Sequence, residues 1–211
     1  MSTTFTIGTH NVNHGTATFK PFADLIGWQE VDNTSATRRL HRTMKAAGWG
    51  TVGLAHECPI SFRDRDWHLH GYEVTKAHQG LAGVSPNRYI TTADIEHKKT
   101  GLRPFMINTH MVSGAFNANT QEKAEKWRDE MWERHYQMLQ DICRANAEKI
   151  VLLVGDLNRQ RGFGFYGLER ADHGSVDHIW VDATTVEVED HDQLSRFGSD
   201  HPAERAKVRV P

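Results

Sequence analysis

The sequence predicts an α/β protein of the α+β type, in which two mainly antiparallel β-sheets form a sandwich and helices lie outside them. Short β-rich segments clearly outnumber helical segments along the 211-residue chain. Neighbouring β-rich segments often follow one another in the order of a hairpin. One run of five apolar residues, 150–154, is typical of a strand that is buried on both faces. Such strands need covering layers, which favours a sandwich.

The first half of the chain contains five strand-like segments and one helical segment. The strand-like segments are residues 5–12, 23–31, 51–54, 59–62 and 67–76. The last two are separated by the polar turn 63–66, so we expect them to pair as a hairpin. Residues 35–47 predict a helix with Leu40 and Met44 on one face, and Gly48 ends it.

The second half contains five further strand-like segments and a long helix. The strand-like segments are residues 88–96, 104–111, 150–154, 175–181 and 206–210. The first two flank the glycine-containing loop 97–101 and predict a hairpin. Asn119 and Glu122 have the spacing of a capping box, which opens a helix that runs to about residue 146. No Gly-, Pro- or Ser-rich linker divides the chain, so residues 1–211 are expected to form one domain.

Composition excludes several classes of protein. The net charge of −2 excludes a strongly basic nucleic-acid binder, but not an enzyme that contacts a few phosphates. Two cysteines are too few for a disulfide scaffold and fit a reducing compartment. No segment is apolar enough to span a membrane, and residues 1–7 do not resemble a signal peptide. We therefore expect a cytoplasmic protein without a membrane partner.

Polar and ionisable residues end four of the predicted strands, are carried by another and precede the last one. Six such groups occur: His10–Asn11, Gln29–Glu30, Asn108–His110, Asp156–Asn158, Asp177–His178 and Asp200–His201. Polar groups at the edge of an apolar sheet are costly unless they are paired or bind something. Oxygen donors of this kind suit a hard cation such as Mg²⁺. The pattern therefore predicts one shared site.

In their combination and order, these groups resemble the motifs of the endonuclease/exonuclease/phosphatase superfamily. The superfamily includes the pancreatic-type deoxyribonuclease and the abasic-site endonucleases. The resemblance covers residues 5–211, essentially the whole chain. It implies a deoxyribonuclease-like, four-layer sandwich with the site at one rim of two packed sheets.

The resemblance also implies a metal site. Glu30 corresponds to the principal ligand, and Asn11 and Asp200 complete or support the shell. The implied cation is Mg²⁺, with Mn²⁺ as the alternative. A divalent cation polarises a phosphate and neutralises its charge.

Further roles are implied for residues that act on the phosphate. Asp156 corresponds to the residue that orients or deprotonates the attacking water, and Asn158 to one that holds this water or a phosphate oxygen. His110 and His201 correspond to hydrogen-bond donors to the scissile phosphate. Asp177 corresponds to the carboxylate that holds the His201 ring, which favours its charged form.

The sequence departs from the superfamily pattern in one place. Relatives usually have an amphipathic helix between the first strand and the Gln-Glu strand, but here only residues 12–22 lie between them. A helix of three turns needs about 11 residues by itself. The short connection either leaves one sheet face less covered or forms an interaction surface.

The substrate is inferred from the residues around the implied site. Arg88 precedes a strand at a place where relatives often contact phosphate, and Glu57 stands near an acidic position of some relatives. Arg159 and Arg161 lie in a loop with three aromatic residues and are candidate contacts to phosphates or bases. These features favour a nuclease that acts on DNA.

Two other functions stay open. One is a phosphatase or phosphodiesterase that acts on a small molecule or a lipid. The other is an inactive relative that binds nucleic acid or protein. A zinc site is the weaker interpretation of His68 and His70, which alternate on one strand face but lack further ligands at zinc-site spacing.

Overall fold

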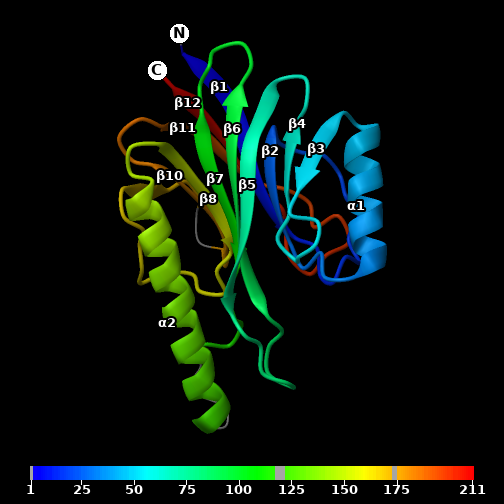
Figure 1. Cartoon of the computed structure of the whole chain (residues 1–211), viewed down its shortest axis with the longest axis vertical. Coiled ribbons are helices and arrows are strands. Elements are labelled where there is room, and N and C mark those ends of the chain that lie inside the picture. The colour runs from blue at the N-terminus through cyan, green and yellow to red at the C-terminus, as the bar shows by residue number, and fades with distance from the viewer. Residues whose placement is uncertain (1, 117–121, 173–174) are drawn as a thin grey trace.

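The computed structural model describes residues 2–116, 122–172 and 175–211. In this part of the chain the strands form two six-stranded sheets that pack face to face. One helix packs on the outer face of each sheet (Figure 1). The four layers are thus helix, sheet, sheet and helix, and the predicted sandwich is confirmed.

The first sheet contains both chain termini. Its strands are, in spatial order, β11 (Glu187–Gln193), β12 (Glu204–Val210), β1 (Thr3–Asn11), β2 (Leu25–Gln29), β4 (Ile60–Arg63) and β3 (Trp49–Val52). β1 and β2 are parallel, and the other pairs are antiparallel. Helix α1 (Thr34–Ala46) buries Leu40 and Met44 against Ile26 and Trp28 of β2. It ends before Gly48, which adopts a positive φ, as the sequence predicts.

The second sheet carries the long helix. Its strands are, in spatial order, β5 (Trp67–His78), β6 (Arg88–His97), β7 (Pro104–His110), β8 (Ile150–Asp156), β10 (Asp177–Asp182) and β9 (Leu168–Arg170). The β6–β7 hairpin is confirmed, and β7 and β8 are parallel. Helix α2 (Glu122–Ala145) packs Trp132 and Leu139 on this sheet. The capping box expected at Asn119 lies outside the described residues.

The predicted hairpin between residues 59–62 and 67–76 is wrong. β4 pairs with β2 and β3 in the first sheet, whereas β5 pairs with β6 in the second, so the turn 63–66 connects the two sheets. Ile60, Phe62 and Trp67 all enter the core between the sheets. Alternation in a sequence reports which side chains are buried and does not report which strand is the partner.

The sequence pattern did not predict two of the strands, β9 and β11. β9 has only three residues, and β11 is an edge strand that is rich in acidic residues and lacks apolar alternation. β11 is matched to β12 by ion pairs that include Lys207 with Glu189 (2.9 Å) and Arg209 with Glu187. The signal for β11 is therefore charge complementarity with the next strand along the chain.

The short β1–β2 connection covers its own sheet face. Residues 12–24, all of them described, contain no helix, as expected from their number. Val12, Ala17, Phe19 and Ala23 are buried with Trp28 against α1. Apolar side chains of the loop thus do the covering that a helix does in relatives.

Candidate active site

The strand register brings the polar strand ends together at one rim of the sandwich. In the second sheet Asp156 stands opposite both His110 on β7 and Asp177 on β10. In the first sheet Asn11 stands beside Gln29, directly before Glu30. The two rims are joined beneath the site because Asn108 of β7 donates to the backbone oxygens of Trp28 and Pro59, both at 2.9 Å.

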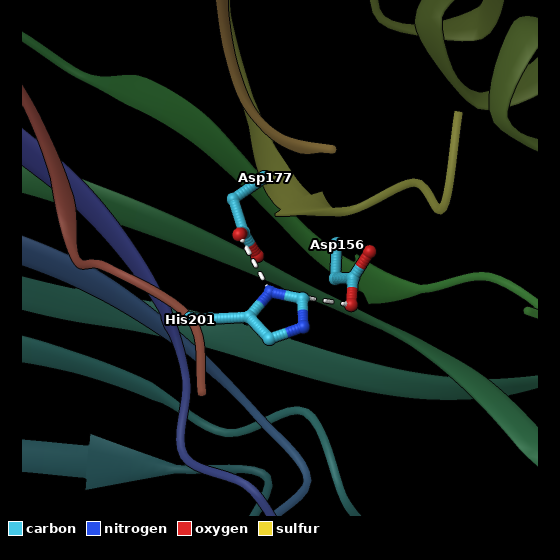
Figure 2. A group of neighbouring side chains, drawn as sticks. All are labelled: Asp156, Asp177 and His201. Atoms are coloured by element: carbon cyan, nitrogen blue, oxygen red, sulfur yellow. Dashed lines mark hydrogen bonds and ion pairs between the residues drawn. The ribbon is translucent and has the colours of Figure 1, made fainter. Parts of the chain in front are cut away.

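Asp156, Asp177 and His201 form the centre of the site (Figure 2). Each offers a ligand atom, and these atoms all lie within 4.8 Å of one another. The His201 Nδ1 lies 2.7 Å from Asp177 Oδ2 and 3.9 Å from Asp156 Oδ2. Asp156 and Asp177 are buried, whereas His201 is partly exposed. The imidazole therefore stands between two carboxylates and solvent.

The surroundings of Asp177 and His201 raise the pKa of both groups. Burial, followed by the charge of Asp156, raises the pKa of Asp177 to about 7. The hydrogen bond to Asp177 raises the pKa of His201 to about 9, against the opposing effect of burial. A protonated ring is thus stabilised by the carboxylates beside it.

Asn11 connects two carboxylates from opposite sheets. Its Nδ2 donates to Glu30 Oε1 (3.1 Å) and to Asp156 Oδ2 (2.9 Å), while its Oδ1 accepts from the backbone N–H of Asn13 (3.0 Å). Glu30 leaves the end of β2 with a φ of 60°. This left-handed conformation is uncommon for a residue with a side chain, and such conformations cluster at functional sites.

The donor set fits a hard divalent cation. In the described part of the chain no Lys or Arg forms an ion pair with Glu30 or Asp156. Their carboxylate oxygens converge near His110, whose Nε2 lies 3.8 Å from Glu30 Oε1 and 3.6 Å from Asp156 Oδ2. Two carboxylates that no Lys or Arg neutralises favour a hard cation with oxygen ligands.

His110 is held by a buried ion pair. Arg88 Nη1 donates to Glu57 Oε2 (2.6 Å) and lies 2.7 Å from His110 Nδ1. Because an arginine can only donate, Nδ1 accepts in this contact when the ring is neutral, which leaves the proton of the neutral ring on Nε2, toward the carboxylates. Burial alone raises the pKa of Glu57, but His110 and Arg88 outweigh it and hold this pKa below its usual value. Arg88 and Glu57 thus reach the site as supports of His110.

The segment after β8 sets the position of Asn158. Gly155 approaches β7 so closely that a Cβ would lie 2.1 Å from the Thr109 carbonyl oxygen. Asn158 has a φ of 51°, and its Nδ2 donates to Met111 O (3.0 Å). Its backbone N–H donates to Asp156 Oδ1 (2.9 Å). The side-chain oxygen of Asn158 is therefore the group left for a ligand.

The other expected residues lie around this centre at different depths. Asp200 is exposed and joined to the site through Ser199, whose Oγ donates to the backbone oxygen of Asn11 (2.7 Å). The Arg159 guanidinium lies 4.3 Å from the Phe116 ring centroid and 5.0 Å from that of Trp132. Arg161 is exposed.

The sequence did not indicate His14 and Asp32 as site residues. The backbone N–H of His14 donates to Glu30 Oε2 (2.9 Å), and its Nδ1 lies 2.5 Å from Asp32 Oδ2. The hydrogen bond to Asp32 raises the pKa of His14. Only the turn at Asn13 and His14, both with positive φ, brings this segment back to Glu30.

His68 and His70 do not join a metal cluster. Both are exposed on β5, and the His70 Nε2 lies 2.7 Å from Glu96 Oε2. Among the described residues, the cluster of three close ligand atoms is the one at Asp156.

Several other histidines are buried in neutral form: burial lowers the pKa of His10 and of His178 to about 4, and that of His135 well below its usual value.

The comparison with known protein families shows to which family the chain belongs. The sequence matches the model of the Endonuclease/Exonuclease/phosphatase family over residues 8–201. The chain belongs to this family. Its members are phosphoester hydrolases that generally depend on a divalent metal ion. A search of curated proteins finds no match.

Solved structures of the family share the whole fold. A family protein from Bacteroides thetaiotaomicron has 14% identity and a TM-score of 0.76, covering 100% of this chain and 99% of that chain. The mannosyl-6-phosphatase Bt3783 of the same organism has 15% identity and a TM-score of 0.67, covering 96% and 98%. D. rerio TDP2 complexed with a single-strand DNA product has 15% identity and a TM-score of 0.70, covering 97% and 98%.

The similarities to these three solved structures show the fold.

Among the described residues, no helix combines the length and apolar character that crossing a membrane requires.

Proposed function

We propose that the protein is a Mg²⁺-dependent phosphodiesterase that hydrolyses DNA. The observation that carries this proposal is the convergence of Glu30 and Asp156 with the rings of His110 and His201 at one rim. Carboxylates attract a hard cation, and imidazole N–H groups donate to phosphate oxygens. Mn²⁺ is the alternative cation.

Three residues of this chain would hold the cation. Glu30 is the principal ligand, with Asn11 and Asp200 in support; rotation of the Asn11 amide would turn its oxygen toward Glu30. When bound, the cation polarises the phosphate and neutralises part of its charge.

The remaining groups act on water and phosphate. Asp156 is oriented by donors from Asn11 and Asn158, so its other lone pairs can accept the proton of an attacking water. The water oxygen bonds to phosphorus, the ester P–O bond breaks, and solvent protonates the leaving oxygen. His110 and His201 donate to the phosphoryl oxygens, which is typically worth a few kcal/mol for each donor. Asp177 positions His201.

Two observations favour DNA over a small phosphate ester. Arg161 is exposed in the loop that follows Asn158, where it can contact a backbone phosphate, and Arg159 is packed against aromatic rings of the same region. A relative with the same fold is described in complex with a single-strand DNA product. The mannosyl-6-phosphatase with this fold keeps a small-molecule phosphatase as the second candidate.

The test is cleavage of plasmid and oligonucleotide DNA with Mg²⁺ or Mn²⁺, with and without excess EDTA. We expect cleavage that EDTA abolishes and that His201→Ala lowers by about 10²-fold or more. Arg65→Ala, an exposed change away from the site, is the control. Full activity in EDTA or in His201→Ala would overturn the mechanism. Turnover of nucleotides or phospholipids but not DNA would favour the second candidate.

A binding measurement addresses the inactive alternative. Mg²⁺ that binds the folded protein raises its melting temperature by mass action. We expect this rise in the wild type and in Arg65→Ala, and its loss in Glu30→Gln. If Glu30→Gln changes neither the rise nor any turnover, the protein is better described as an inactive binding relative.

A further inference from the structure

A cavity of about 590 Å³ adjoins the candidate active site. Two of its lining residues connect it to the catalytic groups. Glu57 is hydrogen-bonded to Arg88, which lies beside His110, and Asp32 is hydrogen-bonded to His14, which lies beside Glu30. Its size falls in the range of small-molecule sites, roughly 300–1,000 Å³. A substrate bound at His110 can therefore extend into this cavity.

A pair of stacked rings forms part of the cavity wall. His56 and Tyr89 have ring centroids 4.1 Å apart and planes inclined by 27°. His56 lies in the loop between β3 and β4 of the first sheet, and Tyr89 belongs to β6 of the second sheet. Both are partly exposed and both line the cavity. Aromatic side chains of this kind offer a platform on which an unpaired base can stack.

Two charged groups flank the rings. Arg38 is exposed at the cavity, and no hydrogen bond or ion pair joins it to another residue in the described part of the chain. Its guanidinium is thus a free donor for an anion such as phosphate. Glu57 is 6% exposed, and its buried Oε1 accepts no hydrogen bond from any described group. A buried acceptor without a partner points to a donor on a ligand.

We infer that this cavity binds one unpaired nucleotide of a DNA strand, next to the scissile phosphate. The base stacks on the His56–Tyr89 pair, and the neighbouring phosphate meets Arg38. This inference rests on the proposed function and narrows its substrate to single-stranded or locally opened DNA. A base inside a duplex is stacked on both sides and is not free to enter.

The test uses a short single-stranded deoxyoligonucleotide that carries 2-aminopurine, whose fluorescence falls when it stacks. Binding is measured in excess EDTA, so that no cleavage occurs. We expect quenching by the wild type, and we expect His56→Ala and Tyr89→Ala to raise Kd by about tenfold and to reduce quenching. His56→Phe and Tyr89→Phe keep a ring and should retain both signals. His68→Ala, an exposed histidine on β5, is the matched control.

Three outcomes would overturn the inference. They are an unchanged Kd and quench in His56→Ala and Tyr89→Ala, equal cleavage rates for single-stranded and duplex DNA of one sequence, or equal affinity for a free mononucleotide and the oligonucleotide. Failure of the proposed function looks different, because the wild type would then cleave no DNA with either cation. If the wild type cleaves DNA and His56→Ala has an unchanged Kd and quench, the inference about the cavity is wrong and the proposed function still stands.

Discussion

Gln29 donates from Nε2 to Oδ1 of Asn108 across the interface of the two sheets, at 2.6 Å. Both residues are fully buried, and Gln29 accepts in turn from Thr9 Oγ1 (3.1 Å). Glu30 follows Gln29 directly, and Asn108 lies two residues before His110. This amide pair therefore sets the distance between the halves of the active site.

Asn108→Ala should lower both stability and activity. It leaves the Gln29 amide and the Trp28 carbonyl without their partner, and each buried orphan costs about 1–3 kcal/mol. The Pro59 carbonyl keeps a second donor, the backbone N–H of Trp28. We expect a loss of about 2–4 kcal/mol in the free energy of unfolding, measured by urea titration. Gln137→Ala, an exposed amide on α2, is the control. Equal losses in both variants would contradict a structural role for the pair.

Arg88→Met should destabilise the protein by about 3–5 kcal/mol, because it leaves the Glu57 carboxylate buried without its charge partner. Arg88→Met with Glu57→Met replaces the pair by apolar groups and should recover most of this stability. Activity should stay low in both variants, since His110 has lost the donor that holds its tautomer. Recovery of activity along with stability would show that Arg88 does not position His110.

Asp177→Asn should lower the pKa of His201. In the metal-free protein the Asp177 carboxylate raises this pKa to about 9, so the ring keeps its proton up to that pH. Without the negative charge the titration midpoint should move toward the ordinary value near 6.5. NMR of the imidazole resonances measures it. An unchanged His201 midpoint would assign its protonation to other groups.

The fold should become less stable as pH falls from about 6.5 toward 4. Burial lowers the pKa of His178 to about 4 and that of His135 well below 6.5. The unfolded chain therefore binds more protons at these histidines in this window. Asp177, whose pKa is raised to about 7, opposes the effect by one group, but His10, His135 and His178 outnumber it, so the free energy of unfolding decreases as pH falls. Each such group contributes up to about 1.4 kcal/mol per pH unit.

Urea titrations across this pH window check the effect. His178→Gln should reduce the pH dependence by about one group, while the exposed control His68→Gln should leave it unchanged. A flat profile in the wild type would mean that these histidines are not buried in neutral form.

The sequence predicted the residues at the centre of the site better than the residues that hold them in place. His110, Asp156, Asp177 and His201 lie at or near the ends of β-rich segments, and the structure brings them together. Arg88 and Glu57 gave a weaker signal, because only their contact with His110 shows what they do. His14 and Asp32 gave none, since their approach to Glu30 depends on two positive φ angles.

The sequence alone determined the fold class, most strand positions and the chemical types at the site. These depend on local properties: apolar alternation, cap residues and polar strand ends. Tertiary structure decided which strands pair and how the loop 12–24 replaces a helix. It also decided that Asn11 joins Glu30 to Asp156, which lies 145 positions after Asn11 in the chain. The reason is that alternation specifies burial alone. Partners are selected by packing, charge matching and buried hydrogen bonds between residues that meet only in the folded chain.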